Sequence, residues 1–127
     1  MIVITFGTFD LYHVGHVRLL ERASNYGKLI VGISSDELNK KKKDRLPVYS
    51  FEERNEIISS NRHVYKTFEE DSLEKKAEYI KKYKADVLIM GDDWKGKFDE
   101  FNTLCKVIYL PRTKTISTTA TIDKIKA

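Results

Sequence analysis

Five short apolar runs, rich in valine, isoleucine and leucine, alternate with stretches whose apolar residues follow helical spacing. Continuous apolar runs are typical of strands buried on both faces, and helices between such strands imply parallel pairing. The run at 64–68 is the most polar, which favours a position at an edge of the sheet. The pattern predicts one α/β domain, 1–127, with a five-stranded, mainly parallel sheet flanked by helices. The predicted strands are 2–6, 29–33, 64–68, 87–90 and 107–110.

Helix signals fill the intervals between the predicted strands. Capping boxes that begin at Ser50 and Asp71, each with glutamate three residues later, predict two helix starts. The polar and basic stretch 36–49 is predicted to be a long loop. Ligands of open parallel sheets bind at the carboxyl ends of the strands, so the loops after the strands are the candidate site. Further helices are predicted over 14–26, near 98–104 and from about 118 onward.

Composition narrows the class of protein. The chain has 127 residues, 41% of them hydrophobic, which is enough to bury a core without disulfides or a structural metal. Its single cysteine, Cys105, excludes an intramolecular disulfide and a cysteine-built zinc site. No apolar run approaches the length of a membrane-spanning helix, and the first residues resemble a strand more than a signal peptide. We therefore expect a cytoplasmic protein with no membrane partner.

The net charge of +4 is concentrated in one place, the lysine run 40–43, which Arg45 extends. Such a run is either a solvated, mobile loop or a site for an anionic ligand. A nucleic-acid site would also need aromatic residues interleaved with the lysines as a stacking platform, and none are present in the run. Small anionic ligands are therefore favoured over nucleic acid.

The loop after the first predicted strand carries His13 and His16 around Gly15. A junction from strand to helix directs backbone N–H groups at a bound anion, and glycines allow a close approach. Imidazoles at this position could donate hydrogen bonds to a phosphate whose charge grows in the transition state. The alternatives are a metal pair, for which few further ligands are present in the sequence, and two incidental polar residues.

Two other loops carry polar groups. Arg112 offers a cationic fork suited to phosphate, and the serine and threonines at 117–119 could bind a phosphate or simply cap a helix. The carboxylates beside Trp94, in 91–94, could hold a sugar hydroxyl or a base edge, or could form a turn. Spacing alone leaves each of these alternatives open.

Together these motifs resemble a known family. Gly7-Thr-Phe-Asp10 with His13-Val-Gly-His16 matches the HxGH signature of nucleotidyltransferases, and 112–119 resembles the RTxGISTT motif of cytidylyltransferases. With Gly91-Asp-Asp-Trp94 and the length, the whole chain is similar to the glycerol-3-phosphate cytidylyltransferases. The resemblance implies a Rossmann-like fold, a homodimer and a requirement for Mg²⁺. It also implies transfer of CMP from CTP to an alcohol phosphate, glycerol 3-phosphate first, giving a CDP-alcohol and pyrophosphate.

The resemblance also assigns roles to individual residues. Catalytic roles fall on His13, His16, Lys43 and Arg112. Nucleotide-binding roles fall on Thr8, Phe9, Asp10, Gly15, Arg45, Gly91, Asp93, Thr113, Ser117, Thr118 and Thr119, and Asp10 is also a candidate metal ligand. Acceptor-binding roles fall on Arg54, Arg62 and Lys76. The chain departs from the family pattern at Tyr65, Leu73 and Thr115, which affects the acceptor side more than the CTP side.

Two other functions remain open from the sequence. Adenylyltransferases of the same superfamily, such as FAD synthetases, share both motifs but use ATP. A non-catalytic module that binds nucleotides or nucleic acid would use the same basic segment without turnover. Pyrophosphate release and a salt-dependent gel shift with nucleic acid distinguish these alternatives.

Overall fold

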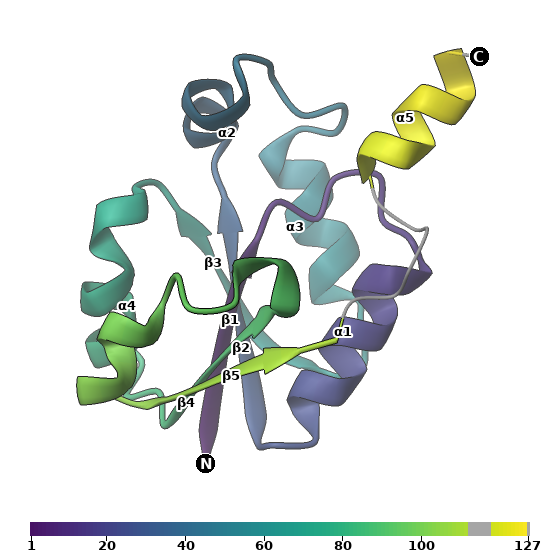
Figure 1. Ribbon diagram of the computed structural model, residues 1–127. Helices are drawn as coiled ribbons and strands as arrows, with labels where there is room; N and C mark the ends of the chain where they lie inside the picture. Colours follow the sequence, from purple (N-terminus) through teal and green to yellow (C-terminus); the bar gives the residue numbers. More distant parts are fainter. Residues whose placement is uncertain (112–117, 127) are drawn as a thin grey trace.

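The computed structural model describes residues 1–111 and 118–126, and its strands form one parallel sheet (Figure 1). The strand order is β3-β2-β1-β4-β5, with parallel pairing at every step. The five predicted strands are confirmed, and the polar third strand lies at an edge as expected. The strands are β1 (Ile2–Gly7), β2 (Lys28–Ser34), β3 (Val64–Glu70), β4 (Val87–Gly91) and β5 (Lys106–Leu110).

Helices cover both faces of the sheet, so the fold is a Rossmann-like α/β arrangement (Figure 1). The α-helices are α1 (Val14–Ser24), α2 (Asp36–Lys43), α3 (Phe51–Ser59), α4 (Lys76–Lys82) and α5 (Thr118–Lys126). Short 3₁₀ helices are η1 (Leu73–Lys75), η2 (Asp92–Trp94) and η3 (Asp99–Thr103). Among the described helices, none is both long enough and apolar enough to cross a membrane.

The core has two halves, one on each face of the sheet. Successive side chains of a strand point to opposite faces, so Val3 and Ile4 of β1 enter different clusters. Val3 packs in the cluster that holds Leu20 of α1 and Ile58 of α3, and Ile4 packs in the cluster that holds Ile80 of α4. This packing fixes the strands, and therefore the loops at their carboxyl ends.

The lysine run is helical, which corrects the expectation of a long loop over 36–49. Ser35 caps α2 by accepting a hydrogen bond from the backbone N–H of Leu38 at 3.0 Å. Acidic residues in the first turn and lysines in the last turn complement the helix dipole, and lysine is a good helix former. The helix ends at Lys43, and the C-cap residue Asp44, with a left-handed φ of 56°, turns the chain away. The loop is therefore limited to the segment 44–50, in which Arg45 is the one basic residue.

The two predicted capping boxes have different outcomes. Ser50 and Glu53 form the expected box at the start of α3. The box predicted at Asp71 is wrong, because Ser72 caps the short helix η1 and α4 begins only at Lys76. The Asp71 carboxylate instead accepts a hydrogen bond from the Tyr79 hydroxyl at 2.7 Å.

Candidate active site

A cavity of about 650 Å³ lies at the carboxyl ends of the strands. It lies beside the central strand β1, from which the strand order continues to β2 on one side and to β4 on the other. Open parallel sheets bind ligands at this point, and the volume is in the range of ligand pockets. The loops after β1, β4 and β5 contribute to its walls. The structure places these predicted site residues around it: Thr8, Phe9, His13, Gly15, His16, Lys43, Lys76, Gly91, Asp93, Thr118 and Thr119.

The two histidines form the N-terminal cap of α1 themselves. The Nδ1 atom of His13 accepts from the Gly15 N–H at 3.1 Å, and Nδ1 of His16 accepts from the His13 N–H at 3.2 Å. The two rings stack with centroids 3.8 Å apart. The backbone N–H groups of His13 and Gly15 are thus already engaged by imidazole. A phosphate in the cavity would meet the Nε2 sides of the rings instead.

His16 is held as neutral imidazole. Burial is the main cause that lowers the pKa of His16 to about 4, and the neighbouring His13 lowers it further, while Asp10 opposes the shift. An Nδ1 atom that accepts a hydrogen bond carries no proton, so the geometry assigns the neutral tautomer with hydrogen on Nε2. His16 is therefore a hydrogen-bond donor on Nε2 at neutral pH.

We predict that stability falls as the pH is lowered from about 6.5 to about 4. The unfolded chain binds a proton on residue 16 below its ordinary pKa, but the folded protein does not until about 4. The contribution of neutral His16 to the free energy of unfolding is therefore fully present above pH 6.5 and is progressively lost as the pH falls toward 4. His16→Asn keeps an acceptor for the His13 N–H and removes the titration. Urea midpoints measured between pH 4 and 7 should converge for the two proteins at low pH, and parallel curves would contradict the prediction.

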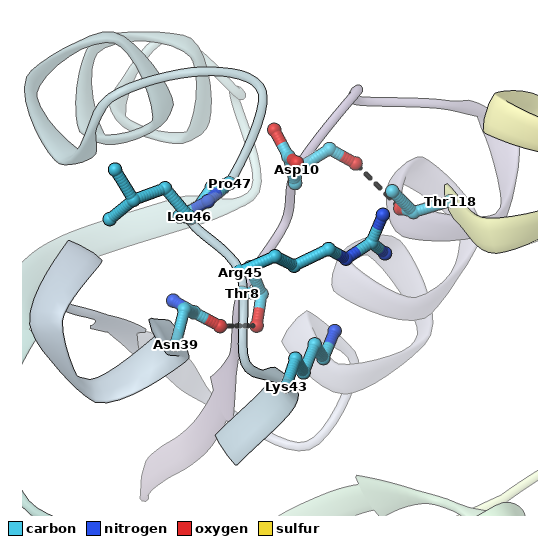
Figure 2. A pocket seen from close by; sticks show the side chains of 8 residues that line it. All are labelled: Thr8, Asp10, Asn39, Lys43, Arg45, Leu46, Pro47 and Thr118. Carbon is cyan, nitrogen blue, oxygen red and sulfur yellow. Dashed lines mark hydrogen bonds between the residues drawn. The ribbon is translucent and has the colours of Figure 1, made fainter. Parts of the chain in front are cut away.

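Asp10 is a clamp for the segment after α2. Its carboxylate accepts from the backbone N–H of Val48 at 2.7 Å, of Tyr49 at 2.9 Å and of Leu11 at 3.1 Å. Its own backbone carbonyl accepts from the Thr118 hydroxyl at 2.6 Å. One residue thus connects the loop after β1, the segment 44–50 and the start of α5. Figure 2 shows the contact between Asp10 and Thr118.

These hydrogen bonds occupy part of the carboxylate of Asp10, the candidate metal ligand. Both carboxylate oxygens already serve backbone donors, and the described residues contain no cluster of three or more histidine, cysteine or acidic side chains. Mg²⁺ is commonly held by one or two carboxylates together with substrate phosphates. The described residues therefore offer no group of side chains that would hold Mg²⁺ by itself, and the role of Asp10 beside substrate phosphates stays a prediction. A metal that enters with the nucleotide triphosphate remains a prediction.

Basic side chains gather next to this clamp. Lys43 and Arg45 line a small recess of about 30 Å³ beside Thr8 and Thr118 (Figure 2). Lys43 also lines the main cavity. Desolvation is the main cause that lowers the pKa of both Lys42 and Lys43, although both side chains still reach solvent. The second half of the lysine run is therefore the part that reaches the site.

We predict that Lys43→Ala weakens the use of a nucleoside triphosphate, whereas Lys40→Ala does not. Lys40 lies on the same helix but does not line the cavity. A charge-assisted hydrogen bond contributes about 1.5–3 kcal/mol, so kcat/KM for the nucleotide should fall by roughly 10–100-fold. Steady-state kinetics at saturating acceptor would measure it. Equal effects of the two substitutions would show that only the total charge matters.

Two of the predicted acceptor-binding residues are not at the cavity. Arg54 is fully buried, and its guanidinium donates to the carbonyls of Tyr49, Thr8 and Ser34 and to Asp36. Arg62 precedes β3 and lies at the amino end of the sheet, opposite the site. Motif matching could not show this, because an arginine that supports loops and one that binds phosphate look alike in sequence. The acceptor-binding prediction is corrected for Arg54, and Arg62 does not reach the cavity within its own chain.

Sequence reasoning missed several contributors to the site. Asn39 is buried, and its side-chain oxygen accepts from the Thr8 hydroxyl at 2.8 Å, which fixes that side chain. Glu70 lines the cavity and forms a buried ion pair with Lys76. No motif marks either residue. The cavity is also lined by Arg22, Met90, Lys97, Phe98 and Phe101, and by Lys42 and Leu73, which the sequence analysis had singled out.

The basic and hydroxyl motif before α5 is only partly described. Thr118 and Thr119 line the cavity. Arg112, Thr113 and Ser117, together with the departure at Thr115, lie outside the described residues. Their roles stay predictions.

Comparison with known proteins gives a family. A cytidylyltransferase-like family model matches residues 4–124. A glycerol-3-phosphate cytidylyltransferase from Bacillus spizizenii is 50% identical over 118 residues, 92% of this chain and 91% of that protein. A FAD synthase from Pyrococcus abyssi is 39% identical over 92 residues, 72% of this chain and 62% of that protein. A lipopolysaccharide core biosynthesis protein from Thermoplasma volcanium shares the fold with a TM-score of 0.77, at 20% identity, covering 90% and 98% of the two chains. The chain belongs to the cytidylyltransferase-like family.

Proposed function

We propose that the protein transfers CMP from CTP to an alcohol phosphate, with glycerol 3-phosphate as the first candidate acceptor. The observation that carries the proposal is the stacked imidazole pair at the start of α1, which lines the cavity and whose Nδ1 atoms are fixed by backbone N–H groups. Identity of 50% with a glycerol-3-phosphate cytidylyltransferase over most of both chains supports this choice of substrates.

In the proposed reaction, a phosphate oxygen of the acceptor attacks the α-phosphorus of CTP. A new P–O bond forms, the bond to the bridging oxygen of the β-phosphate breaks, and pyrophosphate leaves. No covalent intermediate with the protein is needed, so the protein contributes positioning and charge stabilisation. His13 and His16 would donate from Nε2 to the phosphate oxygens, since their Nδ1 atoms are already hydrogen-bonded. Lys42, Lys43 and Arg45 would neutralise the triphosphate.

The test is a panel of nucleoside triphosphates crossed with a panel of alcohol phosphates, read as pyrophosphate release. We expect release with CTP and glycerol 3-phosphate and little with ATP. Activity only with ATP would favour the FAD synthetase-like alternative, which the 39% identity with a FAD synthase supports. Nucleotide binding without turnover would favour a non-catalytic module.

Three accompanying features stay proposals. Chelation of Mg²⁺ should stop pyrophosphate release if the metal enters with the triphosphate. Light scattering should give the mass of a homodimer, as the resemblance implies. A single cysteine and an anionic small-molecule reaction are compatible with the cytoplasm, which fractionation of cells would test.

A further inference from the structure

Asn39 is a buried polar side chain on α2 that reaches the cavity through Thr8. It is only 1% exposed, and its Nδ2 donates to Oγ of Ser34 at 2.7 Å and to the carbonyl of Ser35 at 2.9 Å. A carbonyl oxygen only accepts, so this contact fixes which end of the amide is the nitrogen. The Oδ1 atom therefore points at the Thr8 hydroxyl, which lies 2.8 Å away (Figure 2).

This arrangement fixes the direction in which the Thr8 hydroxyl bonds. A hydroxyl has one proton to donate, and here that proton goes to Oδ1 of Asn39. Oγ of Ser34 donates to the same Thr8 oxygen at 3.2 Å, which leaves that oxygen with one further lone pair. Thr8 is thus an acceptor toward the cavity. Ionised phosphate oxygens also only accept, so the Thr8 hydroxyl offers them no hydrogen bond.

Lys43 is the donor that fits this oxygen. Thr8, Lys43 and Arg45 line the small recess together (Figure 2). Thr8 and Lys43 also line the main cavity, whereas Arg45 does not. The Lys43 ammonium feels the charge of Asp10, but both oxygens of that carboxylate already accept backbone N–H groups. A neutral acceptor would hold the ammonium and leave its charge available for a phosphate.

We propose that Asn39 is a positioning residue: it takes the proton of the Thr8 hydroxyl, and the Thr8 oxygen then holds the Lys43 ammonium toward the phosphates of the nucleotide. The inference rests on the proposed function, because these are the phosphates of the nucleoside triphosphate. The Thr8 hydroxyl then acts on the nucleotide only through Lys43. Its removal should therefore have an effect only while Lys43 is present.

A double-mutant cycle tests this coupling. Thr8→Val keeps the shape of the side chain and removes the acceptor. It should lower kcat/KM for CTP by roughly 10-fold, the low end for a lost hydrogen bond to a charged group. In the Lys43→Ala background the same substitution should change kcat/KM by less than about 2-fold, because the partner is already gone. Thr8→Ser, which keeps the hydroxyl, should recover most of the loss.

Asn39→Ala tests the positioning step. The carbonyl of Ser35 keeps its bond from the backbone N–H of residue 39, and the Ser34 hydroxyl can still donate to the carbonyl of Gly7. We expect kcat/KM for CTP to fall as in Thr8→Val, with no further loss when the two are combined. Ser35→Ala is the matched control, because it removes the cap of α2 but not the contact between Asn39 and Thr8. It should leave kcat/KM within about 2-fold, and urea unfolding would be measured for every variant.

The cycle separates a positioning role from a structural one. A loss in Thr8→Val that disappears in the Lys43→Ala background, with Ser35→Ala nearly normal, supports the inference. Equal effects of Thr8→Val in both backgrounds overturn it, even if Asn39→Ala does not fold. Unchanged kcat/KM in Asn39→Ala, or an equal loss in Ser35→Ala, also overturns it. All of these results leave cytidylyl transfer intact.

Failure of the proposed function gives a different result. If CTP binds without turnover, or if only ATP turns over, the function is wrong. The same cycle, read as the Kd for CTP or as kcat/KM for ATP, then still supports or overturns the role of Asn39. A wild-type protein that binds neither nucleotide overturns both proposals.

Discussion

Replacing His16 with alanine is expected to lower turnover by about 10²–10³-fold while CTP still binds. Loss of one donor that acts on charge developing in the transition state typically has an effect of this size. Nε2 of His16 is the donor in question, because Nδ1 already accepts from the His13 N–H. Single-turnover pyrophosphate release and equilibrium binding of CTP would separate chemistry from binding.

His16→Asn is the control that separates the cap from the chemistry. Its side-chain oxygen can replace Nδ1 as the acceptor for the His13 N–H, but asparagine has no equivalent of Nε2. We expect His16→Asn to be as inactive as His16→Ala and more stable. Full activity of the asparagine variant would mean that the ring serves only as a cap.

Replacing Arg54 with methionine is expected to lower the free energy of unfolding by about 3–5 kcal/mol, the range for breaking a buried charged pair. The substitution removes the partner of Asp36 and of the carbonyls of Thr8 and Ser34. Asp36 is 36% exposed, so we expect the lower end of the range. Urea unfolding would measure the loss.

Arg18→Met is the matched control for Arg54→Met, because Arg18 is exposed on α1. It should change stability by less than about 0.5 kcal/mol. Arg54→Met with normal stability and a raised KM for the acceptor would restore the acceptor-binding role that the sequence suggested. Reduced stability with a normal KM would confirm that Arg54 holds the surrounding loops in place and does not bind the acceptor.

The fold could largely be predicted because buried strands leave a strong signal. The runs around Ile4 and Leu88 are apolar on both faces, and both residues are fully buried. Helix α2 lacks such a signal, since its only buried residues are Leu38 and Asn39 and its last turn consists of lysines. A helix held by caps and by one polar core residue has no apolar periodicity to detect.

The site could be predicted as a location but not as a network. The motif identified His13 and His16, yet it gave no indication that the rings turn back to cap their own helix. It also treated Arg54 and Lys76 as alike, although one supports loops and the other pairs with Glu70 at the cavity. Side-chain direction and pairing depend on tertiary contacts, which spacing along a sequence does not encode.

The clamp at Asp10 restricts the backbone of the segment 44–50 but not the side chains that related proteins can carry there. Asp10 accepts hydrogen bonds from the main-chain amides of Val48 and Tyr49, not from their side chains, and Val48 is 59% exposed. Almost any residue can supply an amide, so natural variation at these two positions can be broad without changing the path of the chain. Proline is the exception, because it has no N–H to donate. Drift in sequence and constancy of backbone geometry can thus coexist beside the site.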